Sequence, residues 1–212
     1  MSKPTGSARV LAGVKRSVLR GELLPGEQLR QERLAAEFEV SRVPLREALL
    51  ILANQGLLKH EPNQGFVVAK RSEDEIGQLH HLLSLLEGEL LRTITWPGAA
   101  TISRMKALNE AMSALVDSPD WVEIIELNHE FHRSLWQCSR LNLFADEVER
   151  VWPLADPYIG RAYSRREDRA RAVREHALII ESLEAHDEEM LLRTSADHRQ
   201  STIKGMAGEF GW

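Results

Sequence analysis

The sequence predicts a mainly α-helical protein of 212 residues with a single short β-hairpin. Apolar residues recur three and four positions apart over most of the chain, which is the period of an amphipathic helix. Glycine and proline residues fall at or near the joints between these periodic segments. After residue 72 no segment alternates between apolar and polar residues as a half-buried strand would. These observations confine the hairpin to the first third of the chain.

The charge is divided unevenly along the chain, although the net charge of −5 describes an acidic protein. Residues 1–70 carry eleven Lys or Arg and seven Asp or Glu, so their net charge is +4. Residues 71–212 carry sixteen Lys or Arg and twenty-five Asp or Glu, so their net charge is −9. A basic part joined to an acidic part indicates a nucleic-acid or membrane contact in the basic part.

Several classes of protein are excluded by simple counts. No run approaches the roughly 18–20 apolar residues of a membrane span, and the first ten residues lack the apolar core of a signal peptide. The single cysteine, Cys138, excludes an internal disulfide and a zinc knuckle built on cysteines. We therefore expect a cytoplasmic protein without a membrane partner.

Three short helices are predicted at the start of the chain. The first covers residues 8–20 and ends at a turn rich in glycine and proline. The second covers residues 31–38. Ser41 is then the expected N-cap of a third helix, and Gly56 is the residue expected to end it.

The hairpin follows the third helix. Two short apolar segments, residues 57–58 and 66–69, flank a turn over residues 62–65. Three helices followed by a two-stranded hairpin form a winged helix-turn-helix, which we place at residues 1–70. The third helix is then the recognition helix.

The first turn of the recognition helix carries Ser41, Arg42 and Arg46. A hydroxyl group and a helix N-terminus suit phosphate oxygens, and arginine suits either phosphate or the paired acceptors of guanine in the major groove. The alternative is that both arginines are solvated helix charges. The order of the surrounding elements favours the DNA contact.

Three runs in this part resemble the GntR superfamily of bacterial transcription regulators. They are GELLPGEQL at 21–29, VSRVPLREAL at 40–49, and GLL with PNQGFVV between 56 and 68. The resemblance implies that Ser41, Arg42, Pro44 and Arg46 form the DNA-binding site and that Gly65 forms the tip of the wing.

The remaining two thirds of the chain predict an all-α antiparallel bundle at residues 71–212, because short loops join successive amphipathic helices. The first helix starts at the cap signal of Ser72 and its apolar stripe is broken at Pro97. The other expected helices cover 99–116, 120–138, 143–152, a stretch after Pro157, 168–185 and 187–207.

Histidines of this bundle fall on inward helix faces. Asn128 and His132 are four residues apart and share an apolar face, and His176 and His198 also lie among apolar neighbours, whereas His129 is expected to be exposed. Three inward imidazoles on three helices fit a site for zinc or another late divalent ion. They equally fit hydrogen-bonded core histidines, and spacing alone leaves both interpretations open.

Two tracts resemble the FCD domain, the effector-binding domain of the FadR-like subfamily. They are NHEFHRSL at 128–135 and EHALIIESL at 175–183. In the metal-binding members an aspartate and three histidines hold the ion. The resemblance maps these ligands onto Asn128, His132, His176 and His198, so that an amide replaces the carboxylate. We expect a divalent ion to bind less tightly here, or to depend more on an anionic effector.

The resemblance also implies an effector pocket for a small organic acid. The family often has an arginine three residues before a glutamate of the first bundle helix. Here the glutamate is Glu87 and the arginine position is Ser84. We expect Ser84 and Trp121 at the pocket.

The sequence thus predicts a homodimeric transcription regulator that binds operator DNA of two-fold symmetry. A small-molecule effector would control its affinity for the operator. One alternative is a winged-helix regulator whose bundle only dimerises and holds neither metal nor effector. A remote alternative is a metal-dependent hydrolase, but the sequence has no nucleophile elbow or Gly-rich phosphate loop. We therefore expect no enzymatic activity.

Overall fold

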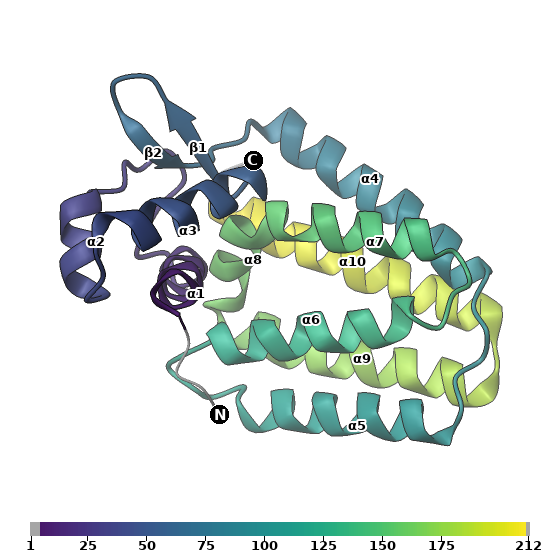
Figure 1. The fold of residues 1–212 in the computed structure, drawn as a ribbon. Helices are drawn as coiled ribbons and strands as arrows, with labels where there is room; N and C mark the ends of the chain where they lie inside the picture. The colour runs from purple at the N-terminus through teal and green to yellow at the C-terminus, as the bar shows by residue number, and fades with distance from the viewer. Residues whose placement is uncertain (1–4, 211–212) are drawn as a thin grey trace.

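The computed structural model describes residues 5–210 and has the predicted mainly α-helical fold (Figure 1). Its N-terminal part is the predicted winged helix-turn-helix. Its elements are α1 (Gly6–Leu19), α2 (Gln31–Glu37), α3 (Arg42–Asn54), β1 (Leu58–Glu61) and β2 (Gly65–Val68).

Apolar side chains of α1, α3 and the hairpin enclose one small core. Val10, Val14 and Val18 of α1 are buried, as the helical spacing predicts. They share this core with Leu45, Leu49, Leu52, Leu58 and Phe66. The strands pair in antiparallel register, with Leu58 opposite Val68 and Glu61 opposite Gly65. The base of the wing is therefore packed into this core next to α3.

The second part is the predicted all-helical bundle. Its elements are α4 (Glu73–Arg92), α5 (Ala99–Ala114), α6 (Val122–Trp136), α7 (Asn142–Val151), the 3-10 helix η1 (Trp152–Ala155), α8 (Asp156–Tyr163), α9 (Arg166–Ala185) and α10 (Glu188–Phe210). Ser72 caps α4 as expected and forms a full capping box with Glu75. Helix α8 starts one residue before Pro157 instead of after it, since proline is tolerated in the first turn of a helix.

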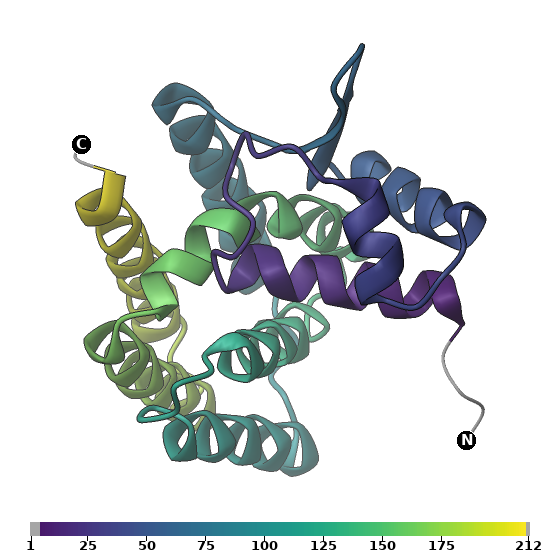
Figure 2. The same ribbon diagram turned by 90° about the vertical axis from the view of Figure 1, so that its left-hand side faces the viewer.

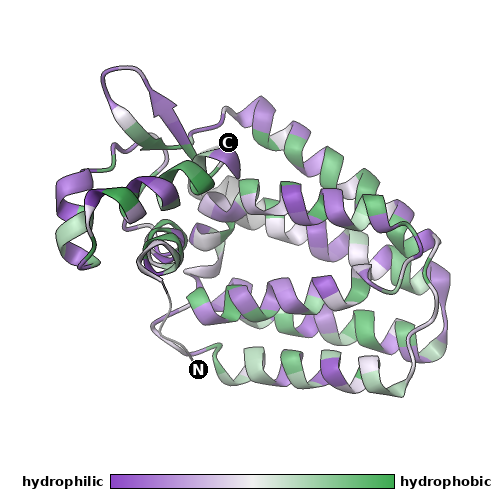
Figure 3. Ribbon diagram, in the orientation of Figure 1, coloured by the Kyte–Doolittle hydropathy of each residue, from purple (hydrophilic) through white to green (hydrophobic). Residues whose placement is uncertain are grey.

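The long helices of the bundle run side by side (Figure 1). Helix α10 packs on α9 and α4, α5 packs on α6 and α9, and α7 packs on α4. Apolar and polar residues are interleaved along each helix (Figure 3). The described part of the chain has no helix long and apolar enough to cross a membrane.

The winged helix is attached to the bundle through α1, which lies alongside α8 (Figure 2). The two backbones approach closely at Gly160, where an added Cβ would lie 2.3 Å from the carbonyl oxygen of Leu19. The Trp121 indole N–H donates a hydrogen bond of 3.0 Å to the same carbonyl, and Arg20, the C-cap residue of α1, pairs with Asp120. Backbone packing, a hydrogen bond and an ion pair together hold the two parts in contact.

Candidate functional site

The recognition helix presents its first turn to solvent. Ser41 has the extended N-cap conformation, but its hydroxyl accepts no cap hydrogen bond from α3. Arg42 and Arg46 are exposed, and Arg42 has only a loose ion pair with Glu32, at 3.7 Å between side chains that are 90% and 92% exposed. The hydroxyl and both guanidinium groups are therefore free to meet an external partner.

Pro44 and Gly65 maintain the shape of the DNA-binding part and are not side chains that reach toward a partner. Pro44 is half-buried beside Gly6 at the start of α1, so it supports the recognition helix. Gly65 begins β2 with a φ of 76°, in the left-handed region that favours glycine, and Asn63 in the same turn has a φ of 64°. The tight wing therefore depends on a glycine at position 65.

The three histidines predicted to face inward meet in the bundle. His132 of α6, His176 of α9 and His198 of α10 are at most 4% exposed. The Nε2 atom of His132 lies 3.2 Å from that of His198 and 3.3 Å from that of His176. One ligand nitrogen of each residue falls within 4.8 Å of the others. The prediction that these side chains lie inward and close together is confirmed.

The surroundings keep His132 and His176 neutral and orient the ring of His198. Burial, together with the neighbouring histidines, lowers the pKa of His132 and of His176 well below the usual value. Glu175 accepts a hydrogen bond of 2.8 Å from Nδ1 of His198, which leaves Nε2 of that ring directed at the other two. The ring of Phe131 stacks on His176 with 4.0 Å between centroids. Imidazoles with converging Nε2 atoms and a carboxylate behind one of them are the donor set that late divalent ions prefer.

Asn128 lies one turn before His132 on α6 and is also buried. Its carbonyl oxygen accepts a hydrogen bond of 3.0 Å from the hydroxyl of Tyr163. Burial raises the pKa of Tyr163, which keeps that hydroxyl protonated and donating. The three imidazoles therefore fit a metal ion, and a neutral amide lies one helical turn before His132 at the position where the resemblance implies a carboxylate.

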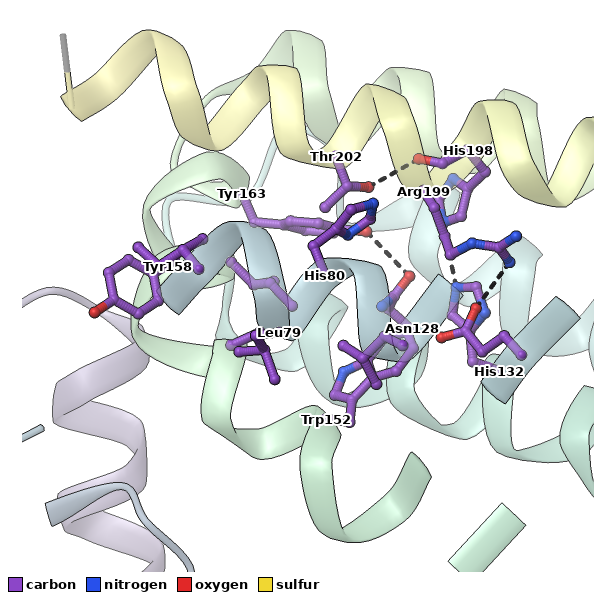
Figure 4. Close-up of a pocket in the computed structure, with 15 residues that line it drawn as sticks. Leu79, His80, Asn128, His132, Trp152, Tyr158, Tyr163, His198, Arg199 and Thr202 are labelled. Carbon is purple, nitrogen blue, oxygen red and sulfur yellow. Dashed lines mark hydrogen bonds and ion pairs between the residues drawn. The ribbon is translucent and has the colours of Figure 1, made fainter. Parts of the chain in front are cut away.

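A pocket opens beside the histidines, between α4, α6, α8 and α10 (Figure 4). One wall is a stripe on α4 with helical spacing, formed by Ile76, Leu79, His80, Leu83 and Glu87. The opposite side is polar near His132 and His198 and apolar around Trp152 and Ile159.

An ion pair lies at the polar end of this pocket. Arg199 donates to a carboxylate oxygen of Glu87 at 2.9 Å, and only 3% of the Glu87 side chain is exposed. Burial raises the pKa of Glu87 to about 7 against the opposing effect of Arg199. Burial also lowers the pKa of His80 to about 4. The Glu87–Arg199 pair therefore shares the pocket with His80, whose low pKa leaves its imidazole neutral near pH 7.

Three expectations from the sequence need correction. Ser84 does not line the pocket and instead contacts His80 at 3.3 Å from the half-buried side of α4. Trp121 does not line the pocket, because its indole N–H is hydrogen-bonded to the carbonyl oxygen of Leu19 in α1. His129 is only 26% exposed, because η1 and α8 fold over that side of α6 and bring Asp156 and Trp152 against it.

Four further polar residues contribute to this site although helical spacing does not point to them: His80, Tyr163, Glu175 and Arg199. Arg199 directly follows His198, and this adjacency is the one feature of the sequence that indicates a place for Arg199 near the site. The partners of the other residues come from distant segments, which periodicity does not reveal.

Comparisons with known proteins agree with this architecture. The model of the "Bacterial regulatory proteins, gntR family" matches residues 7–68, and the model of the FCD domain matches residues 78–201. The transcriptional regulator YdhC of Bacillus subtilis is 30% identical over 83% of this chain and 80% of its own length.

The transcriptional regulator McbR of Escherichia coli is 28% identical over 86% of this chain and 84% of its own length. A solved structure of E. coli McbR/YncC shares the fold, with a TM-score of 0.78, 20% identity, and coverage of 98% of this chain and 100% of that one. The relatives are named as transcriptional regulators, which removes the hydrolase alternative. The chain belongs to the GntR family of bacterial regulatory proteins, carries an FCD domain after its winged helix, and is a DNA-binding transcriptional regulator.

Proposed function

We propose that this regulator senses a small organic acid at a divalent metal ion held in its bundle, and that the acid controls the affinity for operator DNA. The observation that carries the proposal is the convergence of three buried imidazole nitrogens within 4.8 Å at the wall of a pocket. A bundle interior is a usual place for such a site.

The proposed ligands are His132, His176 and His198, with Asn128 as a neutral fourth donor. A bound ion supplies positive charge and an open coordination position for an anion. Because none of these four donors carries a negative charge, both charges of a divalent ion remain to be compensated. This supports an effector with a carboxylate, since the carboxylate supplies the negative charge that the amide of Asn128 lacks.

We propose α8 as the connection between the effector pocket and the DNA-binding part. Tyr158 and Ile159 of α8 line the pocket. The Tyr158 hydroxyl accepts a hydrogen bond of 2.8 Å from the backbone N–H of Arg71, in the link between the wing and α4. Gly160 of the same helix packs against Leu19 of α1. An effector that binds one arrangement of α8 more tightly would thereby select one arrangement of the winged helix.

We also propose a homodimer, because two recognition helices are needed to read an operator of two-fold symmetry. The helices α4 and α7, which pack on each other, both expose large apolar side chains. These are Leu82 (41% exposed), Leu85 (56%), Leu143 (83%) and Phe144 (37%). A second copy of the same patch is the occupant that covers it in a closed dimer.

Sedimentation equilibrium tests this surface with Leu85→Glu. The substitution places a charge in the proposed contact, and we expect it to convert a dimer into a monomer. The control is Leu178→Glu on α9, where an apolar side chain is similarly exposed (45%) outside the proposed contact. A dimer that survives Leu85→Glu unchanged would contradict the assignment.

Metal analysis of the purified protein tests the centre. We expect one divalent ion per chain in the wild type and a loss of the ion in His132→Ala. The matched control is His186→Ala, since His186 is exposed and stacks on Trp96 outside the cluster. A wild-type protein that holds no ion after incubation with Zn²⁺ would contradict the metal proposal.

Thermal shifts with a panel of carboxylic acids then test the sensor role. A flat response with and without Zn²⁺ would favour the alternative, a bundle that only dimerises.

Operator binding tests the recognition helix. We propose that Ser41, Arg42 and Arg46 contact the DNA, with Gly65 at the tip of the wing. Arg42→Ala and Arg46→Ala are each expected to weaken binding and to reduce the slope of log affinity against log salt by about one per lost phosphate contact. Arg140→Ala, in an exposed part of the bundle, is the charge-matched control. Operator retention equal to wild type in both variants would overturn the assignment.

A further inference from the structure

The recognition helix carries an exposed valine in its first turn. Val43 is 68% exposed, more than any other large apolar side chain that the structure describes in residues 5–70. It lies two residues before Leu45 and nine before Leu52, both of which are buried. At 3.6 residues per turn this places Val43 about 160–180° around the helix from that buried face. Val43 therefore points away from the core of the winged helix.

Local folding does not explain a valine at this place. A β-branched side chain loses rotamer freedom in a helix, and the burial that usually offsets this loss is missing here. The bundle approaches the other end of α3, where Gly56 lies close to Leu154, and the first turn lies at the outer end next to α2 (Figure 1). Val43 is thus open to an external partner between Arg42 and Arg46, which are exposed as well.

The chemistry of the major groove limits what an aliphatic side chain can recognise there. In the proposed function α3 lies in that groove, where the first turn of a recognition helix contacts base edges. These edges carry hydrogen-bond donors and acceptors, and the single apolar group among them is the 5-methyl group of thymine. An aliphatic side chain that meets any other base edge removes water from a polar atom without replacing the lost hydrogen bond. A valine therefore favours thymine over the other bases at the position that it faces.

We propose that Val43 reads the 5-methyl group of one thymine in each half of the operator. Arg42 and Arg46 supply the charge that holds α3 on the DNA, and Val43 adds sequence preference without adding charge. This inference rests on the proposed function, since it names a base that the recognition helix selects.

Replacement of thymine by deoxyuridine tests the contact, because it removes only the methyl group and leaves the base pair and its groove acceptors in place. The probe is the duplex that the full-length wild-type protein enriches from a pool of random sequence, and its thymines are replaced one at a time. Fluorescence anisotropy at one fixed salt concentration gives the affinity for each duplex. We expect one position per half-site at which the replacement weakens binding about threefold to fivefold, the effect of one buried methyl group.

Val43→Ser provides the matched variant, since it replaces two methyl groups by a hydroxyl at an exposed position where stability changes little. The thymine and deoxyuridine duplexes should bind this variant equally. Its slope of log affinity against log salt should keep the wild-type value, whereas loss of Arg42 reduces that slope. The control is Ile51→Ser, at an exposed apolar residue (41%) about two turns further along α3, which should retain the full cost of deoxyuridine.

The outcomes separate this inference from the proposal beneath it. A wild-type protein that binds every deoxyuridine duplex as tightly as the thymine duplex overturns the assignment, and so does an undiminished cost of deoxyuridine in Val43→Ser. Both results leave operator binding intact. If the random pool yields no enriched sequence, α3 reads no bases, and the inference fails together with the proposed operator contacts.

Discussion

Gly160→Ala is the substitution that most directly tests the contact between the bundle and the winged helix. The new Cβ would lie 2.3 Å from the carbonyl oxygen of Leu19 and 2.9 Å from its carbonyl carbon. Backbone atoms cannot rotate away as a side chain does, so α1 must move about 1 Å away from α8 to restore an ordinary contact near 3.4 Å.

The energy of this change has two opposing parts. Alanine in place of glycine inside a helix stabilises by up to about 1 kcal/mol, and overpacking of a closely packed contact costs about 1–3 kcal/mol. We expect a net loss of up to about 2 kcal/mol, which lowers the Tm of a chain of this size by up to about 8 °C.

The matched control is Gly77→Ala in α4, where an added Cβ meets no atom within 4 Å. This control keeps the helix propensity gain without the clash, so its Tm should rise by a few degrees at most.

Two measurements check the reasoning on both variants. Thermal unfolding gives the difference in stability, and fluorescence anisotropy with labelled operator DNA gives the effect of an effector on DNA affinity. If α8 carries the coupling, Gly160→Ala should also reduce the ratio of operator affinities with and without effector. A Gly160→Ala protein as stable as Gly77→Ala, with an unchanged ratio, would refute the assigned contact.

The remaining predictions concern the buried polar groups of the bundle. Burial raises the pKa of Asp156 to about 7, so this carboxyl destabilises the fold progressively as the pH rises from about 4 to about 7. Asp156→Asn should match wild-type stability near pH 4 and exceed it above pH 7, by about 4 kcal/mol at most, and a Tm difference independent of pH would contradict this. Asn128→Asp should retain the hydrogen bond from Tyr163 and bind Zn²⁺ more tightly in competition with a chelator, whereas an unchanged affinity would remove position 128 from the site. Glu175→Gln should weaken Zn²⁺ binding by about tenfold to a hundredfold, because it loosens the orientation of His198, and equal retention would assign Glu175 a purely structural role.

Most of the secondary structure could be predicted because its causes are local. The cap at Ser72 depends on residues within one helical turn. The apolar spacing of α1 determines which of its side chains are buried, and Gly65 satisfies a backbone angle within its own turn. The predicted start of α8, after Pro157, is wrong. Proline is accepted in the first turn of a helix as well as in a loop between helices, so its position alone does not fix where the helix begins.

The candidate site was predicted in part. The direction of His132 follows from the helical period within α6, and its meeting with His176 and His198 required the family resemblance as well as the spacing. The exposure of His129 was predicted wrongly, because the segment that covers it lies more than twenty residues further along the chain.

The sequence by itself determined the class of the protein, namely a basic winged helix followed by an acidic helical bundle with an inward histidine on each of three helices. It could do so because propensity, capping and periodicity act over a few residues. Only the tertiary structure decided which polar groups share the pocket. Arg199 pairs with Glu87 across 112 positions of the chain, and Gly160 meets Leu19. Such contacts depend on how whole helices pack, and burial is what raises the pKa of Glu87 to about 7, far above that of an ordinary surface carboxylate.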